Sequence, residues 1–210
     1  MSDLIGNGAT DAADRDVDDA LLLQSAVALL LERKPTEARR VLRELPEDDP
    51  VPAPVFEKGP SAKHPDDVRA VDVDRALAAQ TYDRDGWRCR YCGRRLVVPG
   101  VIELVGILCP KEFRWESDHM PIERTHPAAI RVYPNVDHVL AGAAETELVA
   151  ACTPCNERKG DRVGWTPRPA PALRAGAAWD GLRSRYRPLF ELADAKWRGF
   201  HWGWMDVLGV

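Results

Sequence analysis

The 210-residue sequence contains little that could anchor it in a membrane. The apolar run Leu21–Leu31 is interrupted by Gln24 and Ser25, and it is shorter than the roughly 20 residues that a membrane-spanning helix needs. The first 19 residues are polar and acidic, so no secretory signal peptide is expected. We therefore expect a cytoplasmic protein with no membrane association.

The sequence also lacks an excess of positive charge. Its formal net charge is -4, which argues against a protein that attracts polyanions through its overall field. Residues 1–65 hold 8 Lys/Arg against 13 Asp/Glu, a net of -5, whereas residues 66–210 hold 21 against 20, a net of +1. Any nucleic acid would therefore have to be attracted by local basic clusters.

Cysteine is scarce, and its spacing is informative. Four of the five cysteines form two C-x-x-C pairs, Cys89/Cys92 and Cys152/Cys155, with 59 residues between the pairs. Such pairs favour a metal site in a reducing compartment over a disulfide framework. They can supply four thiolates to one tetrahedral Zn²⁺, and a closed shell of four sulfurs indicates a structural zinc. The alternative is two unrelated pairs of buried or redox thiols, and Cys109 is expected to be a simple buried thiol.

The chain is long enough for one core of ordinary size with appendages. Helices are predicted over residues 17–33, 37–45 with Thr36 as the N-cap, 68–82 and 177–197. Six prolines between positions 46 and 65 disfavour regular structure there. Three Trp residues between 197 and 204 could stack on bases, but core packing is the more common role of Trp. We divide the chain into an acidic disordered start with a helical hairpin (1–45), a Pro-rich linker (46–67), a central domain (68–165) and a C-terminal helical Trp-rich extension (166–210).

The second candidate site lies downstream, where the pattern predicts a strand, a turn of small residues, a strand and a short helix ended by Gly160 or Gly164. Asp137 offers a hard carboxylate oxygen of the kind that Mg²⁺ or Mn²⁺ prefers, and Asn156 offers an amide oxygen from the helix. An ion held by these two groups keeps positions for water and phosphate, so it could promote phosphodiester hydrolysis. His138 would act as the general base on the attacking water.

Basic residues occupy the same predicted helix. Arg158 and Lys159 are expected in its first turns, and Arg162 follows shortly after them. Their positive charges could bind the phosphates of a nucleic acid. We therefore predict that Lys159, Arg158 and Arg162 bind the substrate.

Three segments together resemble a known family: R-D-G-W-R-C-R-Y-C-G (84–93), V-D-H-V (136–139) and L-V-A-A-C-T-P-C-N-E-R-K-G-D (148–161). In this order they resemble the HNH endonucleases of the ββα-metal fold, over roughly 80 residues. The resemblance implies an α+β protein in which a ββα-metal HNH core, stapled by a four-cysteine zinc site, is flanked by helices. It implies that the central domain cuts DNA with Mg²⁺ or a similar ion. It also implies that Asp137 and Asn156 bind this ion, that His138 is the base, and that the four paired cysteines bind zinc.

The sequence departs from the family pattern at two places. The family usually has Asn five residues before the third cysteine, where this chain has Glu147. A carboxylate accepts hydrogen bonds but cannot donate them as an amide can. Leu140 and the short segment 141–144 replace the Pro and Gly-Gly that commonly follow the Asp-His pair. The bracing of the active-site loop is therefore expected to differ.

A second Asp-His pair, Asp118-His119, competes for the catalytic role. From Asp118 the chain runs 33 residues before Cys152, too far for one tight hairpin, whereas from Asp137 it runs 14. Longer family members carry an insert that ends in T-H-P, as residues 125–127 do here. We therefore favour Asp137 and His138. For His126 we expect a hydrogen bond that fixes its loop, and the alternative is a position near the substrate.

These observations predict a metal-dependent HNH endonuclease, in restriction, phage defence or DNA processing. The alternative is a zinc-stabilised module that binds nucleic acid or protein without cutting it. A third, weaker option is a cytotoxic effector with an immunity partner, suggested by the acidic front segment. One small active site needs a homodimer, or two binding events, to cut both strands of a duplex.

Overall fold

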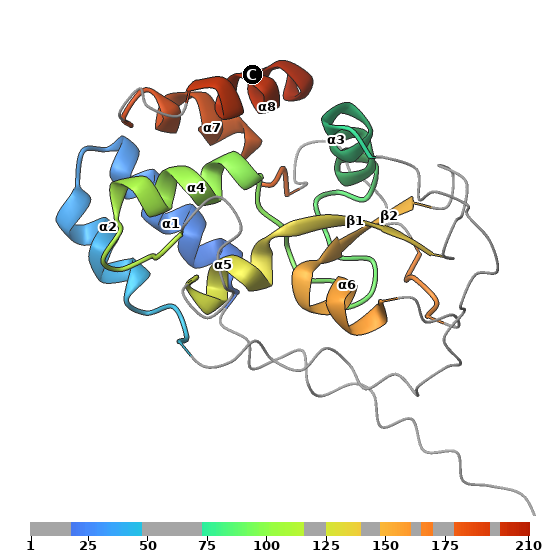
Figure 1. The fold of residues 1–210 in the computed structure, drawn as a ribbon. Helices are drawn as coiled ribbons and strands as arrows, with labels where there is room; N and C mark the ends of the chain where they lie inside the picture. Colours follow the sequence, from blue (N-terminus) through green and yellow to red (C-terminus); the bar gives the residue numbers. More distant parts are fainter. Residues whose placement is uncertain are drawn as a thin grey trace, which may run out of the picture.

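The computed structural model describes residues 18–47, 73–115, 125–139, 148–160, 165–169, 179–193 and 198–210. Within these ranges the chain combines helices with one two-stranded antiparallel sheet, an α+β arrangement (Figure 1). The elements are α1 (Asp19–Leu31), α2 (Pro35–Leu42), α3 (Arg75–Arg84), α4 (Pro99–Leu108), α5 (Pro127–Val132), β1 (Pro134–His138), β2 (Leu148–Cys152), α6 (Thr153–Lys159), α7 (Arg183–Phe190) and α8 (Arg198–Leu208). No helix in the described part of the chain is long and apolar enough to span a bilayer.

Helices α1 and α2 form the predicted helical hairpin. The side chain of Asp18 caps α1 by accepting a hydrogen bond from the Ala20 backbone N–H. The prediction of Thr36 as the N-cap of the second helix is wrong, because α2 begins at Pro35 and Lys34 occupies the capping position. Proline fits the first helical position, since its missing N–H would have no partner within the helix there.

Helix α4 is largely buried, and it was not predicted from the sequence. Every residue from Pro99 to Gly106 is buried, including the charged Glu103. A helix that is buried on all sides shows no polar stripe, so its sequence carries no amphipathic period. Helix α7 packs along α4 at a close approach, where a Cβ on Gly100 would lie 1.9 Å from the Tyr186 hydroxyl.

The two strands and the helix after them occur in the predicted order, and the predicted turn between the strands lies outside the described residues. Strand β1 pairs with β2 in a register that places Pro134 opposite Cys152 and His138 opposite Leu148. Helix α6 follows β2 directly and ends at Gly160, whose φ of 48° favours glycine. The helix begins at Thr153, so the Arg158–Lys159 pair lies in its last turn and not in its first turns as predicted.

The C-terminal region contains two helices where the sequence predicted one over residues 177–197. Helix α7 carries Pro188 in its last turn, and α8 contains most of the Trp-rich segment. Trp204 is buried, but Trp202 is 50% exposed, so core packing holds for the former only. The buried apolar side chains of the first and last helices belong to one cluster. Most of the predicted linker 46–67 lies outside the described residues, so the domain division stays a prediction.

Candidate metal centre and neighbouring carboxylate

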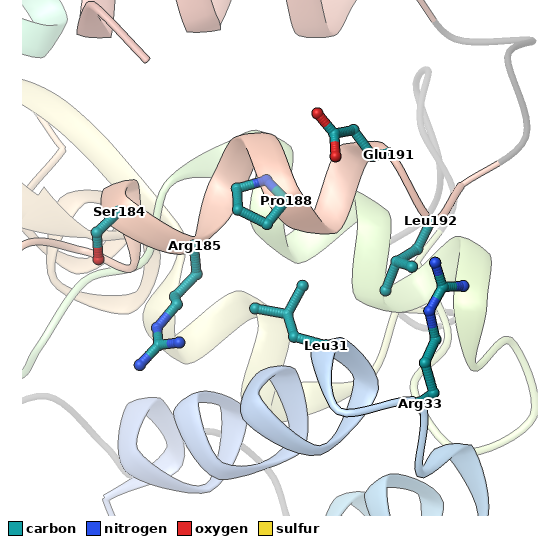
Figure 2. Close-up of a pocket in the computed structure, with 7 residues that line it drawn as sticks. All are labelled: Leu31, Arg33, Ser184, Arg185, Pro188, Glu191 and Leu192. Carbon is teal, nitrogen blue, oxygen red and sulfur yellow. The ribbon is translucent and has the colours of Figure 1, made fainter.

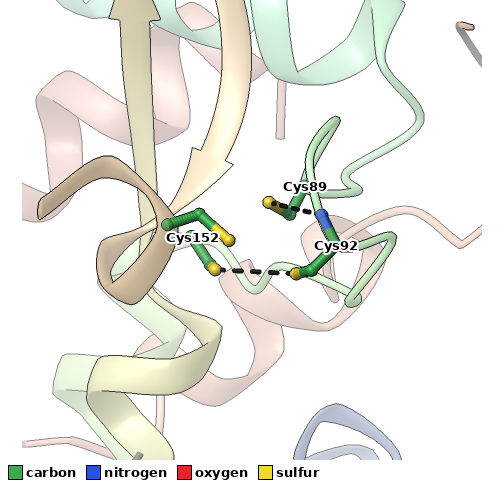
Figure 3. Close-up of side chains that lie close together, drawn as sticks. Cys89, Cys92 and Cys152 are labelled. Carbon is green, nitrogen blue, oxygen red and sulfur yellow. Dashed lines mark hydrogen bonds between the residues drawn. The ribbon is translucent and has the colours of Figure 1, made fainter. Parts of the chain in front are cut away.

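The four paired cysteines meet in space. Their Sγ atoms all lie within 4.8 Å of one another, and 3.8 Å separates Cys92 Sγ from Cys152 Sγ (Figure 3). A disulfide needs about 2.05 Å between its sulfurs, whereas tetrahedral zinc–sulfur bonds of about 2.3 Å place the sulfurs about 3.8 Å apart. The cluster therefore has the ligand type and spacing to hold one metal ion.

Two segments distant in sequence build this cluster. Cys89 and Cys92 come from a tight turn after α3, here called the cysteine knuckle (residues 89–93), which Gly93 closes with a φ of 83°. Cys152 ends β2 and Cys155 lies in the first turn of α6. The Arg90 backbone N–H donates to the Ala150 carbonyl at 2.8 Å, and this bond fastens the knuckle to β2.

The environment of the sulfurs lowers the pKa of Cys89 and of Cys92, which favours the thiolate form at these two positions. Hydrogen bonds from the Cys152 thiol, and then from Cys155 and Cys92, hold the pKa of Cys89 well below its usual range. The thiolate is the form that binds metal. Cys109 is separate from the cluster at the end of α4, and burial raises its pKa. The prediction of a simple buried thiol at Cys109 is confirmed.

Asp137 is a buried carboxylate that contacts the cysteine knuckle. It is 7% exposed, and its Oδ2 accepts a hydrogen bond from the Tyr91 hydroxyl of the knuckle. Its Oδ1 accepts one from Lys159 Nζ at 3.1 Å. Burial raises the pKa of Asp137, while Tyr91 and Lys159 act in the opposite direction. The carboxylate therefore lies between the knuckle and the last turn of α6.

Lys159 is buried and faces β1. It is 2% exposed, and its Nζ also donates to the His138 carbonyl at 2.6 Å. Arg158 beside it is half-buried. In this structure the Lys159 ammonium contacts Asp137 and not solvent, so its predicted contact with substrate phosphate would require it to leave this pair.

Asn156 lies on the face of α6 that is turned toward β1. Residues three apart in a helix are neighbours on its surface, so Asn156 lies between Thr153 and Lys159. Both of these neighbours reach β1, because the Asn135 amide donates to Thr153 Oγ1 at 2.8 Å and Lys159 binds Asp137. The helix therefore presents Asn156 on the same side of the sheet as the Asp137 carboxylate.

His138 is the last residue of β1. Successive side chains of a strand point to opposite faces, so the pleat directs the His138 ring away from the face that carries Asp137. Its Nε2 is buried and has no hydrogen-bond partner within the described ranges. A buried nitrogen with no partner is uncommon in native structures, and it is a position where a water or a ligand atom could bind.

Of the remaining residues that the sequence singled out, His126 is described in the structure and four others are not. His126 Nδ1 accepts a hydrogen bond from the Ala128 backbone N–H at 3.2 Å and caps α5, which confirms its predicted loop-fixing role. The competing pair Asp118-His119, together with Glu147 and Arg162, lies outside the described residues. The choice between the two Asp-His pairs therefore stays a prediction.

Sequence reasoning missed two residues of this region. Tyr91 binds the Asp137 carboxylate, and the fully buried Asp85 binds Arg84, Arg90 and β2. A signal for Tyr91 was available, because a large aromatic residue stands between two metal-binding cysteines. No local signal distinguishes Asp85 from the neighbouring Asp83, which is partly exposed.

Two surface hollows are present in the described part of the chain, and neither is lined by a cysteine of the cluster. One of about 590 Å³ lies between α1 and α7 and contains no predicted site residue (Figure 2). It is lined by Leu31, Arg33, Ser184, Arg185, Pro188, Glu191 and Leu192. A second hollow, of about 260 Å³, touches β1 at Asn135 and Val136 and also contacts α3 and α8.

Comparison with known proteins gives no match to a family model, to a curated protein or to a solved structure.

Proposed function

We propose that this protein is a divalent-metal-dependent endonuclease of the HNH type that hydrolyses phosphodiester bonds in DNA. The observation that supports it best is the arrangement of Asp137 and Asn156. The strand carboxylate accepts a hydrogen bond from Lys159 of α6, the helix that also carries the Asn156 amide, and four clustered cysteines lie beside it. Zinc binding alone requires neither of these two oxygen ligands.

The two metal sites would differ in chemistry. The four cysteines would hold Zn²⁺ in a closed shell with a structural role, because no coordination position remains for water. Asp137 and Asn156 would hold Mg²⁺ or Mn²⁺ through oxygen atoms. When bound there, such an ion supplies charge stabilisation to the phosphate and to the leaving oxygen.

The remaining steps fall to protein side chains. His138 would take the proton of the attacking water at Nε2, which has no competing partner within the described ranges. The ring would have to turn round the end of β1 to reach the Asp137 side, and its place as the last strand residue allows this. Arg158, Lys159 and Arg162 would bind phosphates of the substrate. A homodimer, or two successive binding events, would cut both strands.

A binding module without catalysis is the second candidate. It is favoured by the existing partners of Asp137, whose two oxygens already bind Tyr91 and Lys159. It is also favoured by the net charge of -4, which gives DNA no general attraction. For such a module, the cysteine cluster would stabilise a fold that binds nucleic acid or protein.

Plasmid cleavage separates the two candidates. Supercoiled plasmid is incubated with Mg²⁺, Mn²⁺ or Ni²⁺ and with the wild type, His138→Ala or His64→Ala, a control in the predicted linker. We expect nicking or linearisation by the wild type and by His64→Ala, and a loss of roughly 10²- to 10⁴-fold in His138→Ala. Intact plasmid with every protein and every metal would overturn the nuclease proposal.

A further inference from the structure

We propose that Tyr91 is a positioning residue that couples the four-cysteine site to Asp137, so that metal in the first site sets the affinity of the second site for a divalent ion. The inference rests on the proposed function, because it assumes that Asp137 binds an ion. It assigns a role to a residue between the two sites and predicts that the sites fill cooperatively.

The coupling starts from the position of Tyr91 in the chain. It stands between Cys89 and Cys92, so its backbone belongs to the cysteine knuckle. Its side chain is 2% exposed, and its hydroxyl donates to Asp137 Oδ2. A residue of one metal site therefore contacts a proposed ligand of the other directly, with no intervening side chain.

The Tyr91 ring cannot move independently of the knuckle. Its edge packs against Trp165, with 5.5 Å between ring centroids and 79° between ring planes. On the backbone, Arg90 donates to Ala150, and Arg90 accepts at its carbonyl from the Arg168 N–H at 2.6 Å. A change in knuckle geometry therefore displaces the hydroxyl that holds Asp137.

The hydrogen bonds leave room for a cation on the carboxylate. An ionised carboxylate has about four acceptor positions, of which Tyr91 and Lys159 use one on each oxygen. Without the Tyr91 hydroxyl, both oxygens could turn toward the Lys159 ammonium. Tyr91 thus keeps one oxygen directed away from Lys159 and available to an ion.

Metal in the cysteine site would make this arrangement rigid. Metal–thiolate bonds fix the ligand positions and contribute directly to folding free energy, whereas thiols without metal are joined by weaker contacts such as the 3.8 Å Cys92–Cys152 pair. Partners that orient a metal ligand typically change metal affinity by 10- to 100-fold. Coupling between two binding sites is reciprocal, so an ion at Asp137 should also change the metal affinity of the cysteine site.

The first test measures Mn²⁺ binding to the full-length, zinc-loaded protein by the electron paramagnetic resonance signal of free Mn²⁺. Tyr91→Phe removes only the hydroxyl. Tyr186→Phe is the matched control, because its buried hydroxyl hydrogen-bonds to His201 Nδ1 at 2.8 Å in the packing between α7 and α8. We expect Mn²⁺ affinity to fall by roughly 10- to 100-fold in Tyr91→Phe and to be unchanged in Tyr186→Phe. The zinc content should be one ion per chain in both.

The second test is decided by the wild type, with Tyr91→Phe as a comparison. Co²⁺ placed in the cysteine site gives an absorption spectrum that reports the geometry of the four sulfurs, and Mg²⁺ is spectroscopically silent. Saturating Mg²⁺ should shift this spectrum in the wild type, and it should leave the spectrum of Tyr91→Phe unchanged. The coupling is overturned if the wild-type Co²⁺ spectrum does not change at Mg²⁺ concentrations that fill the Asp137 site.

The outcomes separate this inference from the proposed function. If the wild type binds Mn²⁺ no better than Asp137→Asn, no ion site exists at Asp137 and both proposals fail. If Asp137→Asn loses Mn²⁺ binding but Tyr91→Phe binds like the wild type, the ion site stands and the positioning role of Tyr91 is wrong.

Discussion

The carboxylate of Asp85 accepts a hydrogen bond of 2.8 Å from the backbone N–H of Ala150, in the middle of β2. The same carboxylate binds Arg90 of the cysteine knuckle at 2.8 Å and Arg84 at the end of α3 at 2.9 Å. Its side chain is fully buried. One carboxylate thus joins α3, the knuckle and β2. The relative positions of these three segments bring the cysteines together.

Asp85→Ala should destabilise the protein strongly, because it leaves the Arg90 cation and the Ala150 N–H without their partner. Breaking a buried ion pair from one side costs about 3–5 kcal/mol. Denaturant unfolding of the zinc-loaded protein measures this loss. Glu32→Gln, which removes an exposed ion pair with Lys34, should leave the unfolding midpoint unchanged. Equal midpoints for the two variants would contradict the role of Asp85.

Removal of a cysteine from the cluster should abolish the dependence of the fold on metal. We expect Cys152→Ser to melt at the same low temperature with and without a strong chelator, because three sulfurs cannot close the tetrahedral shell. Wild type and Cys109→Ala should both keep bound metal and lose thermal stability when chelator is added. A chelator-sensitive melt in Cys152→Ser would show that the cluster is not one four-sulfur site.

Lys159→Met should have opposite effects on metal affinity and on stability without metal. The Lys159 ammonium occupies the cation position at Asp137 Oδ1, so its loss should tighten Mn²⁺ binding. Without an ion, the buried Asp137 then lacks a charged partner, and the free energy of unfolding should fall. Mn²⁺ titration and denaturant unfolding measure the two effects, with the exposed Lys111→Met as the control. Unchanged Mn²⁺ affinity would mean that the ammonium does not compete with the ion.

The stability of the α7–α8 region should depend on pH through His201. Burial lowers the pKa of His201 from 6.5 to about 4, so the unfolded chain takes up a proton at a higher pH than the folded one. The stabilising contribution is fully present above pH 6.5 and is lost as the pH falls toward 4. His201→Gln should therefore lose less stability than the wild type between pH 7 and pH 5. Parallel pH profiles of the unfolding midpoint for both proteins would argue against this assignment.

The sequence alone determined the parts of this protein that depend on short-range patterns. The C-x-x-C spacing predicted four clustered sulfurs, and the structure confirms the cluster. The short distance from Asp137 to Cys152 predicted a tight hairpin followed by a helix, and β1, β2 and α6 follow in that order. The apolar period of residues 17–33 predicted α1 to within two residues at each end. In each case the prediction rests on residues that are near one another in sequence, such as the two cysteines of a C-x-x-C pair.

Only the tertiary structure decided which polar groups meet. The sequence predicts that Lys159 binds substrate phosphate, yet packing of α6 on β1 buries its ammonium against Asp137. Tyr91 reaches Asp137 across 46 residues, and Asp85 reaches Ala150 across 65. Helix α4 carries no amphipathic period because neighbours surround it on all sides. A buried polar group must find a partner or lose its hydration without compensation, and the identity of that partner depends on the packing of distant segments, which no local pattern records.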